Sequence, residues 1–242
     1  MERIEFRVLG TLDLRSGGKE DFGPLLAQPK RVALLVYLCL QKPRGLHRRD
    51  TLVALFWPDS DQAHARNSLR NSIHALRRGI GEDAFELRGD EEIGVRESIL
   101  WCDAIEFEEL ARASRVDEAI ELYRGDLLPG FFVDAAPPFE RWLEDQRHRL
   151  RMLAAKAARA AAQRREAENR VTDAISSAQR AVQLSSSDER IVRGLIELLL
   201  RAGDRSEAVR VYEEFARHLA SEFQTVPAKE TTALLYSSRA PG

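Results

Sequence analysis

Residues 62–80 read QAHARNSLRNSIHALRRGI, with four arginines, three amides and two histidines but no acidic residue. At the period of an α-helix, the apolar residues of this segment fall within an arc of about 80°. They are Ala65, Leu69, Ile73, Leu76 and Ile80. The opposite side is polar and consists of Asn67, Asn71, His74 and Arg78, flanked by Arg66, Arg70 and Arg77. The spacing predicts a helix that buries one side and presents hydrogen-bond donors and positive charge on the other.

Such a polar side suits the major groove of DNA, because Arg pairs with guanine edges, Asn pairs with adenine edges, and either can hold phosphate. The same composition is also typical of a solvated helix surface, so the surrounding segments must decide. From Lys42 to Arg78 there are eight Lys and Arg residues against three Asp, in a chain of formal net charge −2. The positive charge is therefore local, which favours an anionic partner at this segment.

The segments on either side of residues 62–80 predict a winged helix. Residues 3–8 alternate between polar and apolar side chains, and Leu12 and Leu14 continue the alternation, which predicts two or three short strands. Three helices are predicted next, at residues 30–41, 50–57 and 62–80. Two short strands at 85–88 and 93–96, joined by Gly89-Asp90-Glu91-Glu92, predict a hairpin. This order places a recognition helix before a wing.

The second half of the chain has a helical composition, with almost no clusters of β-branched residues after Asp103 and many Ala, Leu, Glu and Arg residues at helical spacing. Asp173-Ala174 and Glu207-Ala208 lie 34 residues apart, which is the tetratricopeptide length. We expect about seven helices between Asp103 and Ser237, including one long helix over 139–165. Asp103, Ser186 and Asp204 are predicted to cap three of them, each with an acidic residue in the first turn. The predicted fold is an α+β winged helix at residues 1–100 and an all-α tetratricopeptide-like repeat at 101–242.

Other kinds of chemistry find little support in the sequence. It has no glycine-rich phosphate loop, no CxxC and no HExxH motif, and its five histidines are scattered. We therefore expect no enzymatic activity, no cofactor and no metal. Two cysteines indicate neither a disulfide framework nor a metal cluster. The first residues are charged, and the longest apolar run, Val32–Leu40, is too short to span a bilayer, so we expect a cytoplasmic protein.

Several motifs, in order along the chain, resemble the SARP family of bacterial transcriptional activators. They are LGTLDL at 9–14, HRRDTLVALFWPDSD at 47–61, ARNSLRNSIHALRRGIG at 65–81, YRGDLLPGFF at 123–132, FERWLEDQRHRLR at 139–151 and the C-terminal run at 203–235. The resemblance covers nearly all of residues 3–238. It implies an OmpR-like winged helix followed by a bacterial transcriptional activator domain. It also implies binding to repeated sites in double-stranded promoter DNA, usually as a homodimer, and recruitment of RNA polymerase.

The resemblance also implies which residues face DNA. On the recognition helix these positions fall on Asn67, Arg70, Asn71, His74, Arg77 and Arg78. Arg48 and Arg49, at the start of the preceding helix, are candidates for phosphate contacts, since a helix N-terminus favours anions. Arg88 and Arg96 would follow the wing into the minor groove, although the acidic tip at 90–92 opposes that contact. Trp57 corresponds to a loop that faces polymerase in OmpR-like activators, but it is interpreted here as a core residue.

An alternative function stays open at this point. The helical repeat would bind a peptide or partner domain within a larger regulator, and the winged helix would not be used for DNA. The acidic wing tip favours this alternative, as does the end of the sequence at SSRAPG, which has no obvious folded closure.

Overall fold

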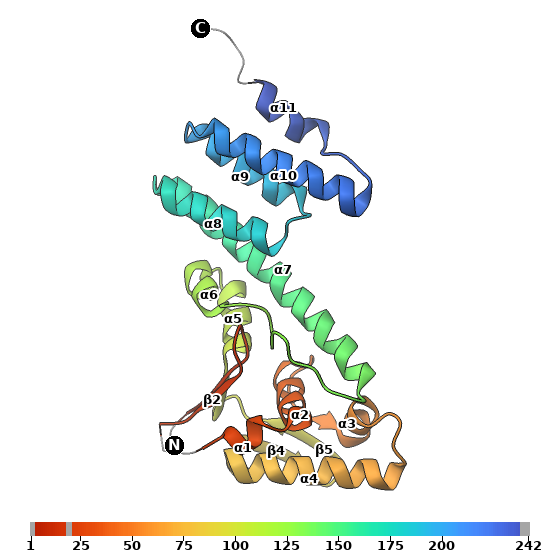
Figure 1. The fold of residues 1–242 in the computed structure, drawn as a ribbon. Helices are drawn as coiled ribbons and strands as arrows, with labels where there is room; N and C mark the ends of the chain where they lie inside the picture. Colours follow the sequence, from red (N-terminus) through yellow and green to blue (C-terminus); the bar gives the residue numbers. More distant parts are fainter. Residues whose placement is uncertain (1–2, 18–20, 238–242) are drawn as a thin grey trace. The chain divides into compact units, whose positions relative to one another are not determined.

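The computed structural model describes residues 3–17 and 21–237 (Figure 1). An α+β region with small sheets comes first in the chain, and an all-helical region follows. The chain divides into two compact units. The first comprises the described parts of Met1–Ala113 and Glu121–Leu150, and the second those of Ser114–Ile120 and Arg151–Gly242.

The first sheet joins the beginning of the chain to a strand near residue 100. Its strands are β1 (Ile4–Arg7), β2 (Asp13–Arg15) and β6 (Leu100–Cys102), in the order β2-β1-β6. β1 pairs antiparallel with β2 and parallel with β6, where Ile4 lies opposite Leu100. The strands at 3–8 and 12–14 were expected from alternation, and β6 was not. β6 has only three residues, too few for a clear alternation of polar and apolar side chains, and its partner strand β1 is at the other end of this region of the sequence.

Four helices follow the first two strands. They are α1 (Gly23–Leu26), α2 (Pro29–Leu40), α3 (Arg49–Phe56) and α4 (Gln62–Ile80). Every residue of α2 from Val32 to Leu40 is buried, as expected of a central helix. α4 confirms the predicted helix with the same bounds and buries the five apolar residues that its period singled out. The carboxylate of Asp61 caps α4 by accepting a hydrogen bond from the backbone N–H of His64 at 2.9 Å.

The second sheet contains the predicted hairpin and one strand that was not predicted. Its strands are β3 (His47–Arg48), β4 (Phe85–Arg88) and β5 (Glu92–Val95), in the order β3-β5-β4, and a short 3-10 helix η1 (Glu82–Ala84) precedes β4. β3 pairs antiparallel with β5 through His47 and Ile93. Gly94 of β5 allows the segment before β3 to lie this close, because a Cβ at position 94 would be 2.4 Å from the backbone oxygen of Gly45.

Two further helices contribute to the core of the first unit. They are α5 (Asp103–Arg112) and the first half of α7 (Pro137–Ala167), whereas α6 (Val116–Leu122) lies mostly in the second unit. The ring of Phe139 on α7 lies 5.0 Å from that of Phe56 on α3. Trp57 is buried beside Phe56, which agrees with its interpretation as a core residue.

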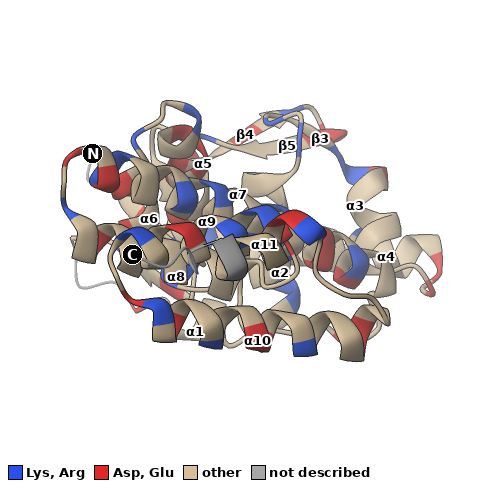
Figure 2. Cartoon of the chain, turned by 90° about the horizontal axis from the view of Figure 1, so that it is seen from above, with Lys and Arg blue, Asp and Glu red and all other residues tan. Residues whose placement is uncertain are grey.

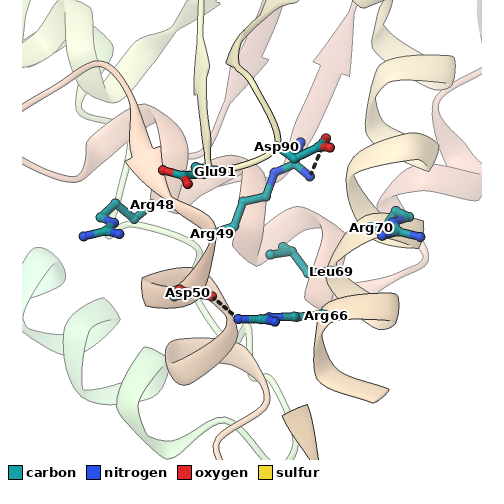
Figure 3. Close-up of a pocket in the computed structure, with 8 residues that line it drawn as sticks. All are labelled: Arg48, Arg49, Asp50, Arg66, Leu69, Arg70, Asp90 and Glu91. Atoms are coloured by element: carbon teal, nitrogen blue, oxygen red, sulfur yellow. Dashed lines mark hydrogen bonds and ion pairs between the residues drawn. The ribbon is translucent and has the colours of Figure 1, made fainter. Parts of the chain in front are cut away.

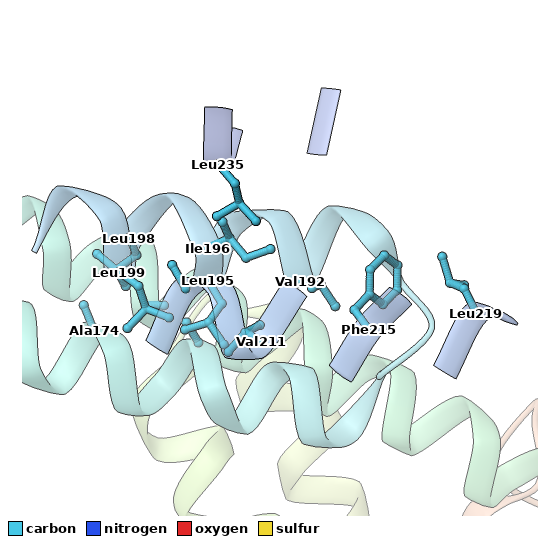
Figure 4. Close-up of a cluster of buried hydrophobic side chains, with 13 residues drawn as sticks. Ala174, Val192, Leu195, Ile196, Leu198, Leu199, Val211, Phe215, Leu219 and Leu235 are labelled. Atoms are coloured by element: carbon cyan, nitrogen blue, oxygen red, sulfur yellow. The ribbon is translucent and has the colours of Figure 1, made fainter. Parts of the chain in front are cut away.

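The second unit contains the helical repeat. Its helices after α7 are α8 (Val171–Leu184), α9 (Glu189–Arg201), α10 (Arg205–Phe223) and α11 (Lys229–Ser237). Ala174 on α8 and Ala208 on α10, the pair that set the 34-residue period, are both fully buried. Around them Leu195, Ile196, Leu199, Val211 and Phe215 form the core of the unit (Figure 4). Within the described residues, seven helices lie between Asp103 and Ser237, as predicted.

Two of the three predicted helix caps are wrong. Asp103 does not cap α5; its buried carboxylate instead accepts hydrogen bonds from the backbone N–H groups of Val8 (2.9 Å) and Leu9 (3.1 Å). Ser186 does not cap α9, because Asp188, two residues later, accepts from the N–H of Arg190. Asp204 caps α10 as expected by accepting from the N–H of Glu207 at 3.1 Å. The carboxylate of Asp103 therefore binds a segment that is distant in the sequence, which the local pattern around residue 103 could not indicate.

Candidate nucleic-acid interface

The polar side of α4 is exposed. Asn67, Arg70, Asn71, His74 and Arg78 have exposed side chains, and none of the five makes a side-chain hydrogen bond or ion pair with another described residue. The opposite stripe is buried in the first unit, which fixes the rotation of the helix about its axis. The polar side chains of α4 therefore point outward from a helix held in place by its buried side, and their hydrogen-bond donors have no partner among the described residues.

Arg77 differs from its neighbours in this row. Its side chain is only 29% exposed, and its guanidinium pairs with the carboxylate of Glu82 in η1 at 3.2 Å. Its Nε is buried and makes no hydrogen bond within the described chain. Arg77 thus connects α4 to η1, whereas Arg78, one residue later, is exposed and unpaired with any described residue.

A surface pocket of about 290 Å³ lies between the start of α3, the first half of α4 and the tip of the β4–β5 hairpin (Figure 3). Four arginines line it, together with three acidic residues and one leucine: Arg48, Arg49, Arg66, Arg70, Asp50, Asp90, Glu91 and Leu69. The predicted phosphate-binding residues Arg48 and Arg49 are thus brought to the same pocket as Arg70 of α4.

The sheet explains how this pocket forms. Arg48 ends β3, which pairs with β5, and it is also the residue that immediately precedes the first turn of α3. The backbone N–H of Arg49 donates to the carbonyl of Glu91 at the hairpin tip, at 2.8 Å. The start of α3 is consequently fixed to the wing. This connection could not be expected from the sequence, because β3 has only two residues.

Carboxylates hold two of the pocket arginines. Arg49 lies 3.8 Å from Asp90 of the hairpin tip, and Arg66 lies 3.2 Å from Asp50 of α3 (Figure 3). Arg66 was not among the positions that the resemblance assigned to DNA contact, although the helical period places it on the flank of the polar row. Arg48 and Arg70 make no side-chain ion pair with any described residue.

The wing itself carries mixed charge. Asp90 is fully exposed, and Arg88 pairs across the hairpin with Glu92 at 3.0 Å. Arg96 follows β5 and has an exposed side chain, while its backbone N–H donates to the carbonyl of Ala84 at 2.9 Å. His47 of β3 adds no positive charge, because burial lowers the pKa of its imidazole below the ordinary 6.5.

The described residues hold no group of three or more His, Cys, Asp or Glu side chains with the arrangement of a metal site. Across residues 3–17 and 21–237, no helix combines the length and apolar character needed to cross a bilayer.

Comparisons with known proteins agree with this architecture. The family model for the bacterial transcriptional activator domain matches residues 103–237. Among solved structures, Mycobacterium tuberculosis EmbR, in complex with a low-affinity phosphopeptide, is similar with a TM-score of 0.69 and 19% sequence identity. The match covers 100% of this chain and 67% of that chain, and at this identity it concerns the fold. No curated protein matches the chain. Because the family model spans more than half of the sequence, the chain belongs to the bacterial transcriptional activator domain family, the family of the SARP regulators.

Proposed function

We propose that this chain is a sequence-specific activator that binds double-stranded promoter DNA through α4 and promotes recruitment of RNA polymerase. One observation supports this most strongly. The side chains of Asn67, Asn71, His74 and Arg78 are exposed and unpaired with any described residue, on a helix whose other side is buried. Amide and guanidinium groups in one row can make the bidentate contacts that distinguish bases in the major groove.

The dimensions of α4 suit this role. Its 19 residues make a helix about 28 Å long, and the major groove, about 12 Å wide, admits one α-helix. Arg70 and Arg78 are free to meet base edges or phosphates. Arg77 would have to leave Glu82 to do so, and we therefore assign it a smaller contribution.

Arg48 and Arg49 are proposed to hold the DNA backbone. They lie at the start of α3, whose positive dipole end favours an anion, although the backbone N–H of Arg49 itself donates to Glu91. Arg49 and Arg66 would exchange the carboxylates of Asp90 and Asp50 for phosphate, and exposed ion pairs of this kind are weak enough to exchange. Arg96, beyond β5, is the proposed minor-groove contact of the wing.

The remaining parts of the proposal follow from the family. We assign DNA binding to residues 1–100 and the activator domain to residues 101–242, a boundary close to the start of the family match at residue 103. The protein would act in the cytoplasm as a homodimer on repeated sites, with RNA polymerase as its partner. It would need no cofactor and catalyse no reaction.

Selection of bound DNA from a random pool, with the purified chain, tests this function. We expect a defined motif to be enriched, and we expect Asn71→Ala and Arg78→Ala to lose preference at individual base pairs. Arg210→Ala is a matched control, because Arg210 lies on α10, where basic and acidic residues alternate (Figure 2), and pairs with Glu207 and Glu214. Enrichment of no motif, or the same motif with the same strength for all variants, would overturn the proposal.

A second candidate function rests on the acidic tip of the wing. Asp90 and Glu91 are exposed where a DNA-facing wing would carry neutral or basic residues. In this alternative the chain is an interaction module of a larger regulator, which works through its helical repeat. It predicts that transcription in vivo is unchanged by Asn71→Ala and Arg78→Ala, whereas the DNA-binding proposal predicts that activation is lost.

A further inference from the structure

A second pocket, of about 230 Å³, lies within the helical repeat. It opens between α7, α8 and α9. Small and apolar residues form its floor, and of these Ala162, Ala178, Ala181 and Ile191 are buried. Arg159 of α7 and three arginines of α9, Arg190, Arg193 and Arg201, also line it. The pocket is smaller than the roughly 300–1,000 Å³ typical of sites for small molecules, and its size suits one or two anchoring side chains of a larger partner.

Gly194 is the most informative residue of this pocket. It lies in the middle of α9, a 13-residue helix, where glycine lowers helix stability relative to alanine. A Cβ at this position would have no atom within 4 Å, so packing inside the chain does not require glycine there. Its backbone lines the pocket. Glycine at such a position allows another chain to approach the helix backbone closely.

The charges around the pocket identify the kind of partner. Arg201 is neutralised by Glu166 at 2.7 Å and lies 4.0 Å from Glu197. Arg159 is exposed and makes no hydrogen bond or ion pair within the described residues. The side chain of Arg190 is largely exposed, and among the described residues it contacts the carboxylate of Asp188 at 3.4 Å.

Arg193 is shared between two partners. Its Nε donates to the hydroxyl of Thr231 at 2.9 Å, and its guanidinium pairs with the carboxylate of Glu189 at 3.8 Å. Four arginines and two glutamates line the pocket, so the lining carries an excess of positive charge over an apolar floor.

We propose that this pocket binds an acidic, partly apolar peptide segment of a partner protein. Apolar side chains of the segment would lie on the alanine floor, its carboxylates would pair with Arg159 and Arg190, and its backbone would pass over Gly194. None of these residues belongs to the set proposed to contact DNA.

Selection from a random peptide display library, with the full chain as bait, tests the proposal. We expect enriched peptides to carry Asp and Glu together with apolar residues. A synthetic enriched peptide, labelled with fluorescein, then reports affinity by anisotropy. We expect Gly194→Trp, which fills the pocket, and Arg159→Glu, which reverses its charge, each to weaken binding by roughly tenfold or more.

Two further variants complete the test. Gly194→Ala adds one methyl group in open space and should fold, but because this group lies where the peptide backbone would pass, it should weaken binding, though less than Gly194→Trp does. Arg210→Glu is the control, since it reverses a charge on α10 outside the lining of the pocket and should bind the peptide as the wild type does. Circular dichroism checks that each variant is folded. If Gly194→Trp does not fold, the affinity of Arg159→Glu alone decides the test.

Three results would overturn the proposal. The first is enrichment of neutral or basic peptides or of none. The second is affinity for the acidic peptide that is unchanged in both pocket variants. The third is conversion of a dimer to a monomer by Gly194→Trp, which would assign the pocket to a second copy of this chain.

Discussion

Arg49 and Asp90 face each other across the proposed DNA interface, with 3.8 Å between guanidinium and carboxylate. Arg49 begins α3, and Asp90 is at the tip of the β4–β5 hairpin. Asp50 and Arg66 repeat the arrangement at 3.2 Å between α3 and α4. The surface that would meet phosphate thus contains carboxylates that compete with it for the same arginines.

Removing these carboxylates should strengthen DNA binding. We expect Asp50→Asn and Asp90→Asn each to raise affinity for DNA of any sequence by roughly two- to fivefold at low salt, because each variant frees an arginine and removes a negative charge. The gain should shrink as salt screens the charge. Fluorescence anisotropy with labelled duplexes across a salt series measures it, with Glu214→Gln on α10 as the control. An unchanged or weaker affinity would place this pocket outside the interface.

The polar row of α4 should supply base preference. We expect Asn71→Ala or Arg78→Ala to reduce discrimination at one or two base pairs by about 1–3 kcal/mol each, the value of a bidentate base contact. Binding measured on a set of single-base variants of the selected site checks this. If both variants lose affinity equally for every sequence, these residues hold phosphate and do not read bases.

Arg48 should behave differently from the polar row. Because it lies at the start of α3, we expect Arg48→Ala to weaken binding to all sequences alike and to reduce the slope of log affinity against log salt by about one. The wild-type slope should correspond to roughly four to eight phosphate contacts per protomer. A loss confined to particular base pairs would contradict this assignment.

Arg77 and Arg78 are adjacent in sequence but differ in their partners. Since Glu82 holds Arg77, we expect Arg77→Ala to weaken DNA binding less than Arg78→Ala does. Glu82→Gln, which frees Arg77, should strengthen binding slightly. Affinities measured in parallel on one duplex test the order, and a larger loss for Arg77→Ala would reverse these two roles.

Glu108 should control the stability of the first unit. Its buried carboxylate accepts hydrogen bonds from Lys42 (2.6 Å), Arg44 (3.4 Å), Arg112 (3.2 Å) and Arg149. Burial raises the pKa of this carboxyl, but the hydrogen bonds and charges of Lys42 and Arg149 outweigh it, so the pKa lies below its ordinary 4.5. Glu108→Gln removes the one buried charge that these partly exposed cations share, and it should lower the free energy of unfolding by about 1–3 kcal/mol, the value for loss of hydrogen bonds to a charged group.

The pH dependence of that loss follows from the lowered pKa. Between the native pKa and 4.5, the unfolded chain binds more protons at Glu108 than the native chain does. Glu108 therefore stabilises the protein above pH 4.5, and this contribution disappears as the pH falls through the native pKa. Urea unfolding at several pH values should show wild type and Glu108→Gln converging in acid. A constant difference between them would contradict the pKa assignment.

Local pattern was sufficient to predict the elements that carry the site. The bounds of α4, its buried stripe and its exposed polar row all follow from the helical period within one segment. The 34-residue spacing likewise anticipated the buried pair Ala174 and Ala208. In both cases the relevant contacts lie on one helix or recur at a fixed distance along the chain.

Contacts between distant segments could not be predicted in this way. β3 exists because His47 meets Ile93, and β6 because Leu100 meets Ile4. Asp103 leaves its expected cap position to bind the N–H groups of Val8 and Leu9. The ion pair of Arg77 with Glu82 depends on the turn after α4, where Gly81 has a φ of 111°. The helical period alone therefore could not show that Arg77 is held by Glu82 while the adjacent Arg78 stays exposed.

Cross-linking from α4 to DNA tests the central claim most directly. Cys39 and Cys102 are both buried, so a cysteine introduced on the surface can be labelled selectively with a photoactivatable cross-linker. With the selected duplex bound, Asn71→Cys should cross-link to bases of the motif, and Arg210→Cys on α10 should not. Cross-links from Arg210→Cys but none from Asn71→Cys would contradict the proposal that α4 binds promoter DNA.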